Sequence, residues 1–376
     1  MIYFDNGATT WPKPPSVRQS VLEAMEHYGA NPGRAGHEMS IATAVMVTQT
    51  RERAAQLFDL PQPEQVIFTQ NCTHGLNIAI QGLLRPGDHV IISDLEHNSV
   101  LRPVYRLAKE GTISFDIAVT VPGDPDATVE AFARCIRPCT RLMVCTHGSN
   151  VFGFVQPVRQ LAGLAREKGI LFLVDAAQTA GLLEIPMTKW GIDYLCTAGH
   201  KGLYGPSGTG LLLVNNEQLP RPLMVGGTGS LSAKGEQPDF LPDALESGTV
   251  NTAGIIGLGA GLAFLQEKGL ESIRHREMTL VHRLWRGLES LPGVELYGDA
   301  PQLPVVSFTV RGQASEETAA GLDQRGAAVR AGLHCAPLAH NKMGTMERGT
   351  VRASLGAFNT ADEVDAFCRD VASLLP

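Results

Sequence analysis

The chain has 376 residues, which suggests two or three domains at about 150 residues each. Hydrophobic residues make up 44% of it, enough for a large buried core, and the formal net charge of −7 gives no general basic surface for nucleic acid. No apolar run approaches the roughly 18 residues of a membrane span. The start, Met-Ile-Tyr-Phe-Asp-Asn, lacks the basic and apolar regions of a signal peptide. We therefore expect a cytoplasmic protein that binds neither nucleic acid nor membrane.

Short apolar runs alternate with longer helical patterns over the first two thirds of the chain. Strands are predicted at 65–69, 89–94, 113–120, 141–146, 170–175, 192–196 and 209–215. Helical patterns fill 40–58, 75–84, 98–110, 127–137 and 157–168. Strands that alternate with helices imply parallel connections, so the sequence predicts an α/β fold with a sheet covered on both faces.

The pattern changes near residue 254, where a glycine-rich segment opens a helical stretch that continues to about 290. Two strands follow at 304–310 and 349–355, and a last helix begins near 361 behind a capping box of Thr360 and Glu363. The sequence after about residue 254 predicts a smaller α+β domain. We expect a large domain over 15–260 and a small one built from 1–14 and 261–376.

A lysine and a carboxylate are expected at one edge of the sheet. Asp175 ends the strand ILFLVD, at the strand end where open α/β sheets bind ligands, although taken alone it fits a helix N-cap better. The next strand delivers His200 and Lys201 to the same edge. This pair suits pyridoxal 5'-phosphate, because the lysine can form a Schiff base while the carboxylate keeps the pyridine nitrogen protonated. Gln178 is placed to hydrogen-bond the ring hydroxyl.

The phosphate of such a cofactor needs its own site, and residues 69–77 offer one between a strand and a helix. Backbone amides at the helix start and the Thr73 hydroxyl would form an anion site, although plain helix capping by Thr73 is the common alternative. The run lacks the spacing of a Walker A loop. His200 is a further candidate for contact with the phosphate.

Two more residues follow strand ends. His97 comes after HVIISD and could stack on the pyridine ring, although a lone histidine in a loop is more often simply solvated. Asn150 lies in the turn after RLMVCTHG, near the expected ring hydroxyl, and its alternative is an ordinary turn asparagine. The seven cysteines include no Cys-x-x-Cys pair, so neither a metal site nor a disulfide framework is expected.

In this order the segments resemble the class V aminotransferase family of pyridoxal-phosphate enzymes. The resemblance runs nearly end to end, and its segments are 3–10, 11–14, 96–97, 175–178, 199–201, 246–252, 330–338 and 352–360. The last two resemble the group II cysteine desulfurases, a branch that includes selenocysteine-lyase-like members. The resemblance implies fold type I of the pyridoxal-phosphate transferases, with a mainly parallel seven-stranded sheet in the large domain and a smaller α+β C-terminal domain.

The resemblance also implies how the cofactor is held. Lys201 resembles the Schiff-base lysine, Asp175 the partner of the pyridine nitrogen and Gln178 the contact to the ring hydroxyl. His97 resembles the stacking residue, and His200 matches a phosphate contact.

Further phosphate contacts follow from the same resemblance. Thr73 matches one, and Cys72 stands where a small hydroxyl residue is frequent. Thr249 matches a residue that reaches the phosphate from the partner subunit, which implies a homodimer. Ala198 replaces a frequent serine, so either one hydroxyl contact is absent or Thr197 supplies it.

On the substrate side, Arg352 resembles the arginine that holds the α-carboxylate, through two parallel hydrogen bonds that a lysine cannot imitate. Arg330 and Asn150 are expected to assist it. Cys335 matches the nucleophile that accepts sulfur in the small domain, and His334 precedes it where the branch often has two histidines. The remaining six cysteines are expected to be small core residues.

These roles imply conversion of L-cysteine to L-alanine, with the sulfur left on Cys335 as a persulfide for an acceptor protein. Lys201 would take and return the α-proton, and L-selenocysteine would follow the same steps. The alternatives are a class V aminotransferase, another β-elimination on a small amino acid with Cys335 as a buried loop residue, and a silent scaffold for sulfur-transfer partners. The scaffold is disfavoured because it has no need for the lysine, aspartate and arginine together.

Overall fold

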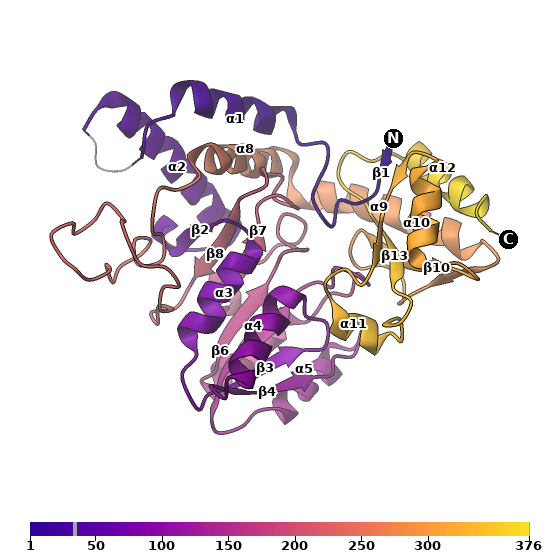
Figure 1. Ribbon diagram of the computed structural model, residues 1–376, viewed down its shortest axis with the longest axis horizontal. Coiled ribbons are helices and arrows are strands. Elements are labelled where there is room, and N and C mark those ends of the chain that lie inside the picture. Colours follow the sequence, from indigo (N-terminus) through magenta and orange to yellow (C-terminus); the bar gives the residue numbers. More distant parts are fainter. Residues whose placement is uncertain (33–35, 376) are drawn as a thin grey trace.

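The computed structural model describes residues 1–32 and 36–375, and Figure 1 gives the arrangement of its elements. The helices are α1 (Pro15–His27), α2 (Glu38–Leu57), α3 (Cys72–Leu83), α4 (Asn98–Lys109), α5 (Pro125–Arg134), α6 (Val158–Lys168), α7 (Met187–Trp190), α8 (Thr252–Lys268), α9 (Leu270–Glu289), α10 (Ser315–Asp323), α11 (Pro337–Lys342) and α12 (Ala361–Ala372). A short 3-10 turn, η1 (Pro63–Gln65), precedes the first strand of the large sheet.

The large sheet has seven strands, as predicted. They are β2 (Val66–Thr69), β3 (His89–Ser93), β4 (Ser114–Ala118), β5 (Thr140–Thr146), β6 (Leu171–Asp175), β7 (Tyr194–Ala198) and β8 (Gly210–Val214). Their order is β2-β8-β7-β6-β5-β3-β4, and only β8 runs antiparallel to its neighbours. Because β3, β5, β6 and β7 are parallel, their carboxyl ends meet at one edge. The α/β fold class is confirmed.

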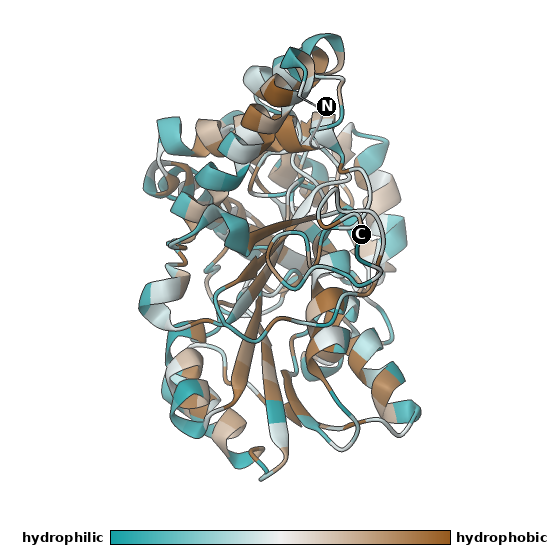
Figure 2. Ribbon diagram, turned by 90° about the vertical axis from the view of Figure 1, so that its left-hand side faces the viewer, coloured by the Kyte–Doolittle hydropathy of each residue, from teal (hydrophilic) through white to brown (hydrophobic). Residues whose placement is uncertain are grey.

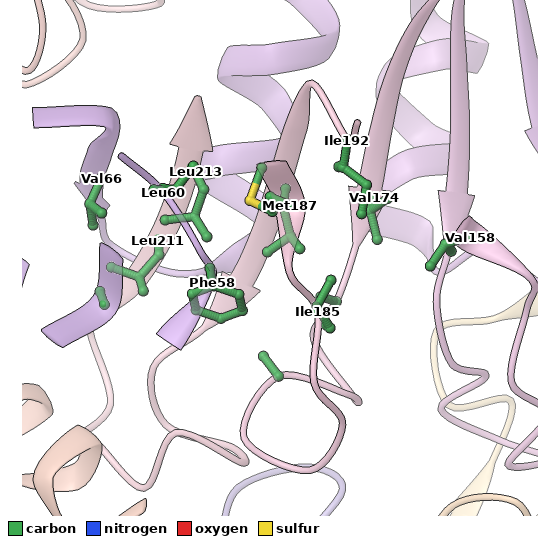
Figure 3. Close-up of a cluster of buried hydrophobic side chains, with 14 of the residues drawn as sticks. Phe58, Leu60, Val66, Val158, Val174, Ile185, Met187, Ile192, Leu211 and Leu213 are labelled. Carbon is green, nitrogen blue, oxygen red and sulfur yellow. The ribbon is translucent and has the colours of Figure 1, made fainter. Parts of the chain in front are cut away.

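Each face of this sheet carries its own hydrophobic core. Along β8, Leu211 and Leu213 belong to one core and Leu212 to the other, which is the period of two that a strand imposes. Figure 3 shows the first core, where Phe58 from the end of α2 lies against the strands. Helices α3 and α4 close the second core. The central strands are largely apolar because both faces are covered, whereas the edge strand β4 is partly exposed. Figure 2 shows a mainly hydrophobic centre inside more hydrophilic helices.

The second sheet has four antiparallel strands in the order β12-β13-β10-β9. They are β9 (Val294–Leu296), β10 (Val305–Val310), β12 (Arg330–Gly332) and β13 (Thr350–Ser354). The sequence predicted β10 and β13 and missed the two three-residue strands. Beside them, β1 (Ile2–Tyr3) pairs in parallel with β11 (Ala327–Ala328), so the chain start joins this part, as Figure 1 shows. The Thr360–Glu363 capping box opens α12 as expected.

Helix α8 explains the glycine-rich segment that opens the last third of the chain. A Cβ atom on Gly257 would meet Val21 of α1 at 2.6 Å, and one on Gly259 would meet Thr50 of α2 at 2.3 Å. The glycines therefore let three helices pack closely (Figure 1). The predicted domain boundary at residue 260 lies inside α8, which continues unbroken to Lys268. The division into two domains stays a prediction. In the described residues, no helix is both long and apolar enough to cross a membrane.

Candidate active site

The predicted site residues of the large sheet follow its parallel strands at their carboxyl ends. His97 comes four residues after β3, Asn150 four after β5, Asp175 ends β6 and Lys201 follows β7 by three. The topology alone therefore brings residues spread over more than a hundred positions to one edge.

Asp175 is a buried carboxylate inside this edge. It is 3% exposed, its Oδ1 accepts the Ala177 amide at 2.9 Å, and the Cys72 thiol donates to the same oxygen at 3.5 Å. Turns rather than a helix follow it, so the N-cap interpretation of Asp175 is wrong. Burial raises the pKa of Cys72 well above its usual value, and the Asp175 charge adds to this, so Cys72 stays a neutral thiol donor.

Lys201 lies within electrostatic reach of this pair. Burial lowers the pKa of its amine, the nearby charge of Asp175 opposes that shift, and Arg352 and Arg330 add to it. A lowered pKa makes the neutral, nucleophilic amine easier to form. The lysine is thus placed among the acid and the arginines that the sequence singled out.

Gln178 lines a hollow together with Lys201 and Gly7. Its side-chain amide donates to the Gly7 carbonyl at 3.0 Å. The glutamine therefore connects the turn after β6 to the N-terminal segment and lies near the lysine, as expected from the sequence.

His97 is the N-cap of α4 and not a solvated loop residue. Its Nδ1 accepts the Ser99 amide at 3.1 Å, so the proton of the neutral ring lies on Nε2. Burial lowers its pKa, the Asp175 charge raises it and the Lys201 charge lowers it again. The ring is therefore fixed within the field of the lysine and the acid.

The first turn of α3 differs in detail from the sequence expectation. Asn71, not Thr73, is the N-cap, and its Oδ1 accepts the His74 amide at 2.9 Å. Thr73 is exposed in the first turn, so the capping interpretation of Thr73 is wrong and its hydroxyl is left for another partner. Amides of a first helical turn have no carbonyl partner within the helix, so this turn suits an anion.

Thr197 of β7 does not supply the hydroxyl contact that Ala198 lacks. The Thr197 hydroxyl donates to the Ala176 carbonyl at 3.4 Å and is fully buried, so it is not free to replace the missing serine. Among described residues, the buried Nδ1 of His200 has no partner, and burial lowers the pKa of this histidine to about 4. A neutral ring with one open nitrogen suits a polar group of a ligand.

Thr249 is not brought to the lysine within this chain. It is exposed and lines a separate hollow with Gln70, His74 and Met224. Lys201 does not line this hollow, and the role of Thr249 across a subunit boundary stays a prediction.

Two arginines from the small sheet face the same carboxylate. Arg352 of β13 is 2% exposed and donates from Nη2 to Asp5 Oδ1 at 2.9 Å and from Nη1 to the Asn150 carbonyl at 3.0 Å. Its Nε is buried and has no partner among the described residues. Arg330, opposite Arg352 in the ladder, donates from Nη2 to Asp5 Oδ2 at 2.8 Å. This leaves a buried guanidinium donor free for a substrate carboxylate.

Asp5 was missed by sequence reasoning. It lies in the segment Tyr-Phe-Asp-Asn and reaches the site because β1 pairs with β11 and Asp5 forms a bridge with Ser354 of β13. An acid close to two arginines cannot be recognised when 325 and 347 positions separate it from them. The available signal was that this acidic residue lies within the segment 3–10 that resembles the family.

The loop of Cys335 docks on the start of α4. The Asn98 amide donates to the Cys335 carbonyl at 2.7 Å, which brings the cysteine next to His97. The Asn150 side chain donates to the His334 carbonyl at 2.8 Å. Cys335 is exposed, and both His334 and Cys335 have left-handed backbones, with φ of 49° and 56°. Each such residue costs about 1–2 kcal/mol, so these contacts hold a strained turn.

The other cysteines are only partly as expected. Cys145 and Cys196 are fully buried, and Cys72 is buried beside Asp175. Cys139, however, is exposed in the turn before β5, so its assignment to the core is wrong. The pattern Arg-Pro-Cys-Thr, with a proline and no apolar neighbours, already resembles a surface turn.

Comparison with known proteins shows the family of the chain. The family model "Aminotransferase class-V" matches residues 2–367, and the chain belongs to this family. A protein named "Probable cysteine desulfurase" from Methanothermobacter thermautotrophicus is 34% identical, over 96% of this chain and 92% of its own length. A "Cysteine desulfurase" of Escherichia coli is also 34% identical, over 97% and 91%. The apo structure of a cysteine desulfurase from Thermococcus onnurineus covers 100% of this chain and 94% of its own, with 33% identity and a TM-score of 0.91.

Proposed function

We propose that the chain is a pyridoxal-phosphate-dependent cysteine desulfurase that converts L-cysteine to L-alanine and keeps the sulfur as a persulfide on Cys335. The observation that carries the proposal is the 2.7 Å hydrogen bond from the Asn98 amide to the Cys335 carbonyl. It brings an exposed thiol next to His97, on the edge that also holds Lys201 and Asp175. A class V enzyme that only transaminates has no need for a thiol there.

The residues present fit the cofactor. Lys201 would bind its aldehyde carbon, Asp175 would hold the proton of the pyridine nitrogen, and His97 would stack on the ring. The first turn of α3 and the open Nδ1 of His200 supply contacts for a phosphate. When bound, pyridoxal phosphate supplies the electron sink that stabilises negative charge on the substrate α-carbon.

Side chains of this chain bind the substrate and carry out the proton and sulfur transfers. Arg352 holds the substrate carboxylate with its free Nε while Asp5 and Asn150 fix the guanidinium from two sides. The Lys201 amine takes the α-proton and returns a proton to the product. The Cys335 thiolate bonds to the substrate sulfur as the Cβ–S bond breaks, and the electron pair stays on carbon, where protonation gives alanine.

We also infer a homodimer in which Thr249 reaches the phosphate of the partner's site. The support is its exposed position in a hollow lined by the apolar side chains Leu223 and Met224, which are 43% and 54% exposed. Co-expression of Lys201→Ala and Thr249→Ala chains tests this. Each mixed dimer should have one site with both residues intact and so show about half of the activity of a wild-type dimer, and no gain would overturn the shared site.

The persulfide on an exposed cysteine suits transfer to an acceptor protein, and seven free thiols suit a cytoplasmic setting. L-Selenocysteine would use the same groups. The experiment is incubation with L-cysteine and a reductant. Wild type should release equal amounts of sulfide and alanine, whereas Cys335→Ala should release neither above background. Pyruvate without alanine would instead indicate elimination, and sulfide release that survives Cys335→Ala would disprove the persulfide route.

A further inference from the structure

Behind Cys335 lies a buried chain of three polar side chains that none of the roles above uses. His334 Nε2 faces the Arg330 carbonyl at 3.3 Å, and His334 Nδ1 faces His340 Nε2 at 3.2 Å. His340 Nδ1 in turn faces the Thr345 hydroxyl at 2.7 Å. His334 is 9% exposed, and the other two are fully buried.

The protons of this chain have one arrangement when both rings are neutral. The Arg330 carbonyl can only accept, so His334 Nε2 carries a proton and Nδ1 is an acceptor. His340 Nε2 must then donate to His334, and the Thr345 hydroxyl must donate to His340 Nδ1. The two ring planes differ by only 11°, so the hydrogen between them lies close to both planes. Burial lowers the pKa of His334 to about 3 and that of His340 to about 4, which keeps both neutral.

This arrangement rules out the simplest role for the histidine next to the nucleophile. The only lone pair of neutral His334 is taken by His340, and its N–H is taken by a backbone carbonyl. His334 therefore has no free nitrogen with which to remove the proton of the Cys335 thiol. Its contacts instead fix the left-handed turn of residues 334 and 335 from inside, while Asn98 and Asn150 hold it from outside.

We propose that His340, acting through His334 and backed by Thr345, is a positioning residue for Cys335. His340 lies on α11, the helix that begins two residues after Cys335, and is six residues from His334, which it orients. His340 holds the Cys335 thiol beside His97 and does not move a proton. The inference rests on the proposed function, because it takes Cys335 to be the sulfur acceptor.

The test compares His340→Gln with His340→Leu in the holoenzyme. A glutamine places an N–H near the position of Nε2 and can still donate to His334, whereas leucine cannot. We expect His340→Leu to lower kcat at least tenfold with KM for L-cysteine within twofold, because substrate binding by Arg352 is untouched. His340→Gln should keep kcat within about threefold of wild type.

His89 offers a matched control. It is also fully buried, and its Nδ1 faces the Thr140 hydroxyl at 2.8 Å, but it starts β3 at the opposite end of the sheet. His89→Leu should lower thermal stability without the selective loss of kcat. Hydrogen exchange of the 331–337 backbone gives a readout that does not need turnover. It should accelerate in His340→Leu and remain at the wild-type rate in His340→Gln.

The outcomes separate the two proposals. Wild-type protein that forms no persulfide would overturn the proposed function, while the exchange rates would still decide whether His340 holds the loop. Equal kcat in His340→Leu and wild type, or unchanged exchange of 331–337, would overturn the positioning role. Equal losses of kcat in the leucine and glutamine variants would overturn the hydrogen bond as its basis.

Discussion

Arg352 gives the sharpest quantitative prediction for substrate binding. Its guanidinium donates from Nη2 to Asp5 and from Nη1 to the Asn150 carbonyl, and Nε is the guanidinium nitrogen that has no partner among the described residues. In Arg352→Lys the charge remains, but a single ammonium cannot serve Asp5, Asn150 and a substrate carboxylate from the same place. One hydrogen bond between charged groups contributes about 1.5–3 kcal/mol, which corresponds to about a 10- to 150-fold weaker affinity.

Steady-state sulfide release at varied L-cysteine measures this. We expect KM to rise by about 10- to 150-fold in Arg352→Lys, with kcat within about threefold, because the lost contact acts on the carboxylate and not on the reacting bonds. Arg348→Lys is the control, since Arg348 is an exposed arginine whose ion pair with Glu295 spans 3.0 Å. It should leave KM unchanged. An unchanged KM in Arg352→Lys, with normal thermal stability, would refute the assignment of Arg352 to the carboxylate.

Three further predictions concern an ion pair of α11, the two buried histidines and Lys201. Lys342→Met removes the 2.7 Å ion pair between Lys342 and Asp94, whose two side chains are 15% and 11% exposed. The free energy of unfolding, measured in urea titrations, should therefore fall by about 2 kcal/mol. No change would mean that the ion pair does not stabilise the fold. Because the pKa of His334 and that of His340 are lowered to about 3 and about 4, the unfolded chain binds more protons below about pH 6.5, and stability should decline from there toward pH 4. Denaturation midpoints between pH 7 and 5 should fall less steeply for His340→Gln than for wild type, and equal slopes would contradict burial of a neutral ring. Lys201→Ala should abolish release of alanine at any substrate concentration, and residual turnover above 1% would contradict its role as the proton-transfer base, where a loss of about 10²–10⁴-fold or more is expected.

The sequence was sufficient for the large sheet because most of its strands are short apolar runs buried on both faces. The strand ending at Asp175 and the strand before Lys201 were predicted on this basis, and parallel topology then required the two residues to share an edge. The short elements were beyond reach, since three residues such as those of β9 or β12 carry no period. Helix α1 was also missed, although Pro15 at its first position was a usable start signal.

The parts of the site that sequence reasoning missed depend on contacts between distant segments. The family resemblance indicated Arg352 but not Asp5, because the pairing of β10 with β13 and the bridge of Asp5 to Ser354 exist only after folding. His340 was passed over for a related reason. His334 and His340 do not share one helix or strand, because His334 lies in a turn and His340 on α11, and that turn around Cys335 brings the two rings together.

Mass spectrometry of Cys335 tests the central claim most directly. After a brief exposure of the cofactor-loaded protein to L-cysteine, without reductant, the 331–340 peptide should carry one added sulfur atom on Cys335, and the same peptide from Lys201→Ala should carry none. A persulfide located on another cysteine, such as the exposed Cys139, or sulfide release with Cys335 unmodified, would contradict the account.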